Sequence, residues 1–177
     1  VKDIKLEFNN IMIQKNLKSI LINTVIVLTI FFIDRASKIY ILNIEEIKGV
    51  VDVYINPYLN FYLIWNNGIA FGFLSFDQSG AYNFITLIIA VITFVILLMI
   101  CRSSGKNLYF LIFILGGSFG NLFDRIYYSA VPDFIDFHIS DFHWFIFNVA
   151  DIFITMGVLC LILDEIFFNK RVKNEIK

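Results

Sequence analysis

Two aspartates, Asp133 and Asp151, have the residue type and placement that hydrolytic chemistry requires in an otherwise apolar chain. Two carboxylates a few ångströms apart cannot both ionise cheaply, so such a pair shares one proton. The ionised partner activates a water molecule and the protonated partner polarises a carbonyl group. If the fold brings the two aspartates together, they indicate peptide hydrolysis of the aspartic type, without a nucleophilic side chain.

Amide and charged side chains stand close to both aspartates in the sequence. Asn121, Asp124 and Arg125 are spaced i, i+3 and i+4, so they share one face of a helix. Asn148 and Asp151 are spaced i and i+3, one turn into a further helix. An acid inside a membrane span costs a few kcal/mol, so it indicates function unless it forms an ion pair or hydrogen bond between helices.

The acids differ in whether a cation lies near them in the sequence. Asp34 precedes Lys38 by four residues and Asp124 is followed directly by Arg125, so we predict that these two acids have structural roles. Asp151 has no neighbour of opposite charge. It is therefore the stronger candidate for chemistry.

The composition places these polar residues in a membrane protein. Hydrophobic residues make up 59% of the 177 residues and charged residues only 16%, against about a quarter in soluble domains. No linker, repeat or low-complexity stretch divides the chain, so we predict one domain over residues 1–177. The net charge of −1 argues against a nucleic-acid partner.

Long stretches with few charges predict four transmembrane helices and hence an all-α membrane fold. About 20 apolar residues are needed to cross the hydrocarbon core. The predicted helices cover about residues 18–40, 79–101, 107–127 and 144–168.

Lysine and arginine predict the orientation, because positive residues near helix ends stay in the cytoplasm. Ten of the fourteen fall before the first helix, between the second and third, or after the fourth. Both termini should therefore be cytoplasmic, with Asp124 and Asp151 near the outer face.

A cleaved signal peptide is the competing interpretation of the N-terminus, but the apolar run ends at Ile33, Asp34 and Arg35 rather than at a small-residue cleavage site.

The segment between the first two helices, about residues 44–76, has a different pattern. It is rich in β-branched and aromatic residues, with turn signals at Asn56-Pro57 and Asn66-Asn67-Gly68. This pattern predicts a small extracytoplasmic β-sheet with aromatic side chains such as Trp65 at the membrane interface. An ordinary loop that dips into the headgroups is the alternative.

The remaining reactive side chains are weaker candidates. Cys101 and Cys160 fall away from the outer face, so we interpret them as small apolar residues. His138 and His143 lie near Asp136 and Asp141 in the predicted outer loop, which suggests a metal, but their spacing matches no strong zinc motif. We therefore predict no metal and no organic cofactor.

Five motifs in order resemble those of the lipoprotein signal peptidase family, also called signal peptidase II. They are DRASK at 34–38, NNGIAF at 66–71, GGSFGNLFDR at 116–125, VPDF at 131–134 and FNVAD at 147–151. One four-position motif arises by chance in such a chain about once in a thousand, so five in order are highly specific. The resemblance covers about residues 30–157.

The resemblance implies roles for the polar residues by position. Asp133 and Asp151 match the catalytic aspartates, and Asn121 and Asn148 match residues that line the site. Residues that hold the substrate or brace the two aspartates correspond to Asn66, Asp124 and Arg125, and a structural pair corresponds to Asp34 and Lys38.

The resemblance also implies a function. Such an enzyme removes the signal peptide from bacterial prolipoproteins, cutting before a diacylglyceryl-modified cysteine at the outer face of the cytoplasmic (inner) membrane. Inhibition by cyclic peptides such as globomycin is then expected, as is contact with membrane lipids. Four helices can bury a site without a partner, so we expect a monomer.

Two other classes of protein remain open. In a transporter or ion-conducting subunit, Asp124, Arg125 and Asp151 would relay protons or ions, but helices two and three are apolar over most of their depth. In a structural assembly factor, replacing Asp133 would change only solubility. Substitution of Asp133 and Asp151 separates the three classes.

Overall fold

The computed structural model describes residues 2–68, 79–140 and 142–169, with side chains for 17–68, 82–140 and 142–167. Helices and one small sheet alternate along the chain. In order they are α1 (Lys2–Lys48), β1 (Asp52–Asn56), β2 (Leu59–Asn66), α2 (Ser79–Arg102), α3 (Lys106–Tyr128), β3 (Val131–Ile139), β4 (Phe142–Phe147), α4 (Val149–Asp164) and the π-helical turn η2 (Glu165–Asn169).

Three of these helices are long and apolar enough to cross a membrane: Leu17–Lys48 within α1, Tyr82–Arg102 within α2, and α3. The outward side chains of α2 are apolar, with Phe84 63% and Leu87 60% exposed, as expected of a surface that contacts lipid. The α-helical part of α4 has 16 residues and spans about 24 Å, less than the hydrocarbon core of about 30 Å. The prediction of four transmembrane helices is therefore matched for three.

The ends of the first and last helices differ from the prediction. The first helix continues from residue 40 to Lys48, because Ile41 and Ile44 pack against Val51 and Phe134 of the sheet region. The fourth helix begins at Val149 rather than at about 144, because residues 142–147 form β4. The bounds of α2 and α3 lie within one residue of the predicted 79–101 and 107–127.

The sheet has four antiparallel strands in the order β1-β2-β3-β4. The first two come from the predicted β segment 44–76, of which residues 69–76 lie outside the described residues. The predicted small sheet is confirmed, and it extends beyond this segment because the chain after α3, where an outer loop was predicted, forms β3 and β4. β2 pairs with β3, with Ile64 opposite Asp133 and Asn66 opposite Val131, so the sheet joins two distant parts of the sequence.

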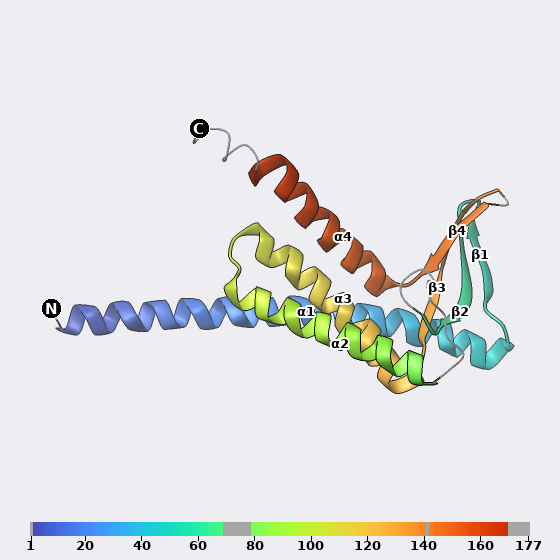
Figure 1. Ribbon diagram of the computed structural model, residues 1–177, viewed down its shortest axis with the longest axis horizontal. Helices are drawn as coiled ribbons and strands as arrows, with labels where there is room; N and C mark the ends of the chain where they lie inside the picture. The colour runs from blue at the N-terminus through green and yellow to red at the C-terminus, as the bar shows by residue number, and fades with distance from the viewer. Residues whose placement is uncertain (1, 69–78, 141, 170–177) are drawn as a thin grey trace.

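The sheet lies at one end of the helices (Figure 1). The turn between α2 and α3 and the C-terminal end of α4 lie at the opposite end (Figure 1). All four lysines and arginines after α4 belong to residues 170–177, which lie outside the described residues. This arrangement is compatible with the predicted orientation.

α3 is the central helix and contacts α1, α2 and α4. Glycines allow its close approach to two of them. A Cβ atom at Gly117 would collide with the backbone oxygen of Ala150, and one at Gly116 would lie 2.8 Å from Cβ of Ile30. On α4, a Cβ atom at Gly157 would lie 2.6 Å from the backbone oxygen of Phe110. The small-residue surface thus brings α3 against both α1 and α4.

Candidate active site

Asp133 lies near the start of β3 and is only 3% exposed. Both of its carboxylate oxygens accept hydrogen bonds from amides: Nδ2 of Asn66 donates to Oδ2 at 2.8 Å, and Nδ2 of Asn148 donates to Oδ1 at 2.6 Å. Pairing of β2 with β3 brings Asn66 to this place from a position 67 residues earlier. The carboxylate is therefore fixed in orientation by neutral donors.

Asp151 lies in the first turn of α4 and takes part in the N-terminal cap of that helix. Asn148 is the capping residue: its Oδ1 accepts from the backbone N of Asp151 at 3.1 Å, and its own backbone N donates to Oδ2 of Asp151 at 3.2 Å. This reciprocal pair is a capping box, which satisfies two donors at the helix start. The other oxygen, Oδ1 of Asp151, accepts from Nδ2 of Asn121 on α3 at 2.8 Å.

Asn148 therefore joins the two aspartates. Its side-chain amide donates to Asp133 and accepts from the backbone of Asp151, and it is completely buried. Asn148, between β4 and α4, thus holds the carboxylate of Asp133 on the sheet near that of Asp151 on α4.

The neighbourhood of Asp133 favours its protonated form. Burial, followed by the charge of Asp151, raises the pKa of Asp133 from its ordinary value of 3.8 to about 7, while the hydrogen bonds from Asn66 and Asn148 oppose the rise. An aspartate that titrates near neutral pH beside a second carboxylate has the behaviour expected of a pair that shares one proton.

A cluster of buried charges lies next to this pair. The ammonium of Lys38 donates to Asp34 at 2.9 Å, to Asp124 at 2.6 Å and to Oδ1 of Asn121 at 3.1 Å. Asn121 thus links Lys38 to Asp151, since its oxygen faces Lys38 and its nitrogen faces Asp151. The sequence predicted the pair of Asp34 and Lys38, and the structure adds Asp124 and Asn121 as partners of the same ammonium.

The predicted local partner of Asp124 was wrong. Asp124 pairs with Lys38 and, at 2.5 Å, with Arg35 of α1, whereas Arg125 points elsewhere. Adjacent residues on a helix diverge by about 100°, so sequence neighbours rarely meet. Arg35 was missed among the site residues, although its place inside the DRASK motif was a usable signal.

Asp34 connects α1 to the start of α4. Its Oδ1 accepts from the backbone N of Ala150 at 2.9 Å, and it is completely buried. A carboxylate at a helix N-terminus is favourable because unpaired N–H groups and the helix dipole are positive there. A Cβ atom on Gly120 would collide with Oδ2 of Asp34, so glycine at this position leaves room for the contact.

Arg125 fixes the chain that follows β2. Its guanidinium donates to the backbone oxygen of Gly68 at 2.9 Å and to that of Asn121 at 3.2 Å. The backbone N of Gly68 in turn donates to Oδ1 of Asn66 at 2.8 Å. Arg125 therefore supports Asn66, which contacts Asp133, rather than either aspartate directly.

The two aspartates line a pocket of about 300 Å³. Its polar part contains the two aspartates with Asn66, Asn121, Arg125 and Asn148, while Ile89, Ile154, Val158 and Leu159 line an apolar part between α2 and α4. Ser118 and Thr155 also line it and were not predicted from the sequence. The place of Ser118 inside the GGSFGNLFDR motif was a usable signal, whereas Thr155 belongs to an apolar stretch without recognisable spacing. The arrangement offers a water-activating carboxylate pair at one end of an apolar pocket.

Comparison with known proteins identifies the family of the chain. Residues 26–167 match the family model described as signal peptidase (SPase) II. The lipoprotein signal peptidase of Pelagibacter ubique (strain HTCC1062) is 54% identical over 160 residues, covering 90% of this chain and 96% of that protein. The lipoprotein signal peptidase of Aquifex aeolicus (strain VF5) is 36% identical, covering 84% and 88%.

Solved structures give the same result for the fold. One described as a bacterial membrane enzyme, determined by the in meso method, superposes with a TM-score of 0.63 at 26% identity and covers 86% of this chain and 90% of its own. A second structure of the same description has a TM-score of 0.62 at 25% identity, with coverage of 82% and 93%.

Proposed function

Since the chain belongs to the signal peptidase II family, we propose that it is an aspartic-type endopeptidase of the membrane that removes signal peptides from bacterial prolipoproteins. The cut falls before the diacylglyceryl-modified cysteine. The observation that carries this proposal is the placement of Asp133 and Asp151: amide donors orient both carboxylates, and Asn148 joins them at one end of an apolar pocket.

In the proposed reaction the aspartate pair holds one proton between its two members. The ionised carboxylate removes a proton from water as the water oxygen attacks the scissile carbonyl carbon, and the protonated carboxyl donates to the carbonyl oxygen. The tetrahedral intermediate then collapses: the C–N bond breaks, the leaving amine takes a proton from the pair, and a hydroxyl of the intermediate returns a proton to the pair as the carbonyl re-forms. Asn66, Asn121 and Asn148 hold the carboxylates in position for both steps.

The apolar part of the pocket suits the substrate. Ile89 comes from α2, and Ile154, Val158 and Leu159 come from α4, so the space lies along the helices. An apolar signal peptide or an acyl chain can occupy such a surface without losing hydrogen bonds. We propose that the substrate enters sideways from the lipid, with its cleavage site beside Asp133.

We further propose a topology for the whole chain. α4 and η2 together form a fourth span, both termini are cytoplasmic, and the sheet lies outside the cytoplasmic membrane. The 177 residues then act as one monomeric domain that needs no cofactor, with Asp34 and Lys38 as its structural pair.

A proton or ion relay across the membrane has less support. From Asp151 to Asp164, a distance of about 20 Å along α4, the only polar side chain is Thr155. A relay needs polar groups through both halves of the membrane.

The decisive experiment is cleavage of a lipid-modified prolipoprotein in detergent. We compare wild type with Asp133→Asn and Asp151→Asn, with Asp52→Asn as control because Asp52 is exposed on β1, outside the pocket. Each dyad variant should lose at least about 10³-fold in kcat/KM, as members of a catalytic unit do. Normal cleavage by either folded variant would exclude the dyad.

The pocket also allows a test by inhibition. Globomycin should inhibit wild type and should compete with the prolipoprotein. Inhibition that is insensitive to the substrate concentration would contradict a shared site.

A further inference from the structure

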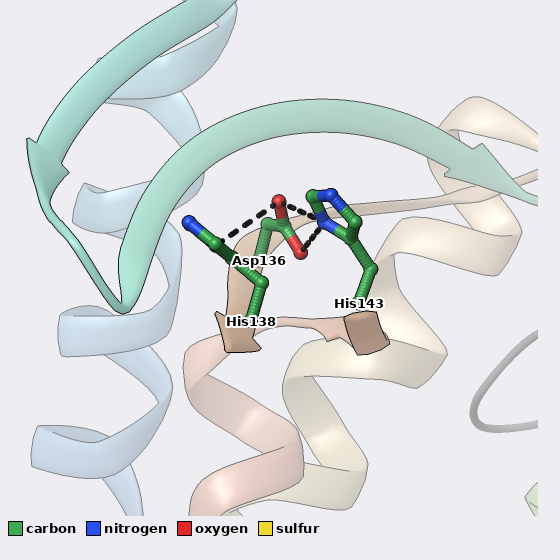
Figure 2. Close-up of side chains that lie close together, drawn as sticks. All are labelled: Asp136, His138 and His143. Carbon is green, nitrogen blue, oxygen red and sulfur yellow. Dashed lines mark hydrogen bonds and ion pairs between the residues drawn. The ribbon is translucent and has the colours of Figure 1, made fainter. Parts of the chain in front are cut away.

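A second cluster of potential ligand groups lies on the hairpin of β3 and β4. Asp136 and His138 come from β3 and His143 from β4, and their ligand atoms all lie within 4.8 Å of one another. Figure 2 shows both imidazole rings beside the carboxylate of Asp136. None of the three residues lines the pocket that contains the two aspartates.

Strand pairing explains why these residues meet. His138 stands directly opposite His143, and their rings stack with centroids 5.0 Å apart. Asp136 precedes His138 by two residues and so projects to the same face of β3. The register shifts between Asp136 and His138, an irregularity that re-aims side chains. The ligands come from two strands across a hairpin, so no linear zinc spacing is visible in the sequence.

Asp136 and His138 are both buried, and one nitrogen of His138 lacks a hydrogen-bond partner among the described residues. Asp136 is 3% and His138 8% exposed. Nδ1 of His138 is buried, and among the described residues it has no hydrogen-bond partner; it lies 3.7 Å from Oδ2 of Asp136, too far for a hydrogen bond. Buried polar atoms of this kind need an explanation such as an ion.

His143 supplies the third potential ligand, and its exposed side chain connects the cluster to solvent. Its Nδ1 lies 2.9 Å and 2.8 Å from the two oxygens of Asp136, and its side chain is 54% exposed. An ion pair of Asp136 with a protonated His143 would explain this contact. It would not explain why Nδ1 of His138 is buried and turned to the same carboxylate.

We propose that Asp136, His138 and His143 form a binding site for Zn²⁺. Two imidazole nitrogens and one carboxylate oxygen are a donor set that suits this ion, and three protein ligands leave a fourth position for water. Tetrahedral ligands about 2.0–2.1 Å from zinc are about 3.3 Å apart, so the 2.8 Å and 3.7 Å separations between Asp136 and the two histidines need shifts of about half an ångström. The ligand atoms of the two histidines lie within 4.8 Å of each other and would approach by at most about 1.5 Å. Asp141, also considered from the sequence, lies outside the described residues.

The site has a structural consequence. Asp133 stands three residues before Asp136 on the same strand, and the alternation of a strand places the two on opposite faces of β3. Zinc would clamp β3 to β4 near the turn, while Asn148 at the other end of β4 contacts Asp133. This proposal departs from the prediction of no metal made from the sequence. The proposal does not depend on the proposed peptidase activity.

Zinc binding can be measured directly because the chain has only two histidines. Full-length protein without a histidine tag is purified in detergent, stripped with a chelator, dialysed and titrated with Zn²⁺ against a chromogenic chelator. We expect one Zn²⁺ per chain, and a loss of affinity of at least about tenfold in Asp136→Asn and in His143→Ala. Asp52→Asn, an exposed acid on β1, is the control and should bind as wild type.

The result that overturns the proposal is equally clear. Absence of stoichiometric binding, or equal binding by wild type and His143→Ala, excludes the site. His143 contacts the buried carboxylate of Asp136, so thermal melting of the stripped variants checks that they remain folded, and His143→Gln, which keeps a hydrogen-bond donor, serves as a second variant. Equally tight binding of Mg²⁺ would mean an unselective carboxylate contact and would also exclude the zinc site.

Discussion

Two pairs of buried aspartates lie side by side and differ in what compensates them. Asp34 and Asp124 share the ammonium of Lys38, and Asp124 also pairs with Arg35. Asp133 and Asp151 receive hydrogen bonds from amides, and among the described residues no cationic side chain donates a hydrogen bond to their oxygens. A cation keeps a buried carboxylate ionised, whereas neutral donors leave it able to take a proton. The first pair can therefore serve architecture and the second acid–base chemistry.

The largest expected effect comes from removing the shared cation. In Lys38→Met, Asp34 and Asp124 remain buried with one positive partner fewer, which should destabilise the protein by about 3–5 kcal/mol. Denaturation in detergent, compared with the exposed Lys18→Met as control, measures the loss. A change below about 1 kcal/mol would mean that water or Arg35 compensates these acids, and the contrast between the pairs would fail.

Gly120→Ala tests the space around the charge cluster. Its Cβ atom would meet the carboxylate of Asp34. Overpacking of this kind should lower stability by about 1–3 kcal/mol, and the displaced Asp34 should loosen the start of α4. The control is Ala36→Ser, a small change at an exposed position of α1. Gly105→Ala is not suitable as a control, because φ is +65° at Gly105 and an alanine there would be strained. Stability equal to wild type would show that Asp34 has room to move.

Asn121→Leu separates the two pairs, because Asn121 is the residue that contacts both. Asp151 loses a donor and Lys38 loses an acceptor. Leaving buried groups unsatisfied in this way costs about 1–3 kcal/mol, so we expect a 10- to 100-fold fall in kcat with a smaller change in KM. Loss of stability with unchanged kcat would instead assign Asn121 to the charge cluster alone.

The smallest expected effect is the pH dependence of the rate and of stability, which reports the proton held by Asp133. Because the pKa of Asp133 is raised to about 7, the reaction that needs one proton on the pair should be about tenfold slower at pH 8 than at its plateau near pH 6. The folded state holds a proton that the unfolded state releases near pH 4, so stability should fall as the pH rises from about 4 through 7.

Asp133→Asn should flatten that fall in stability, since it removes the titrating group. Thermal melting from pH 4 to pH 9 measures both curves. A wild-type protein whose melting temperature is the same at pH 5 and pH 8 would show that Asp133 is ionised throughout this range.

Much of this arrangement was visible in the sequence because membranes impose simple lengths and burial rules. The apolar run of α2 has no charge for over twenty residues, which leaves little choice of bounds. The FNVAD motif placed Asp151 one turn into α4, where the capping box of Asn148 now explains its spacing. The catalytic roles of Asp133 and Asp151 stay predictions.

The features that the sequence analysis missed depend on contacts between residues far apart in the chain. Residues 142–147 are apolar and aromatic, a composition shared by buried strands and by the start of a membrane helix, so periodicity alone could not separate the two. The partner of Asp124 came from α1, 86 residues earlier at Lys38, and no local spacing encodes such a pair. The metal cluster arises only after β3 and β4 pair.

The contact between Asp34 and Ala150 bears on how the enzyme is made. The two residues are 116 positions apart, so at about 5–20 residues per second a ribosome adds Ala150 some 6–23 s after Asp34. Asp151 follows one residue later, and its donor Asn121 waits for it on α3. A nascent chain thus holds only one of the two aspartates of the pocket until its last helix emerges. If this pair performs the proposed hydrolysis, synthesis order alone keeps the unfinished protein inert within a membrane full of apolar segments.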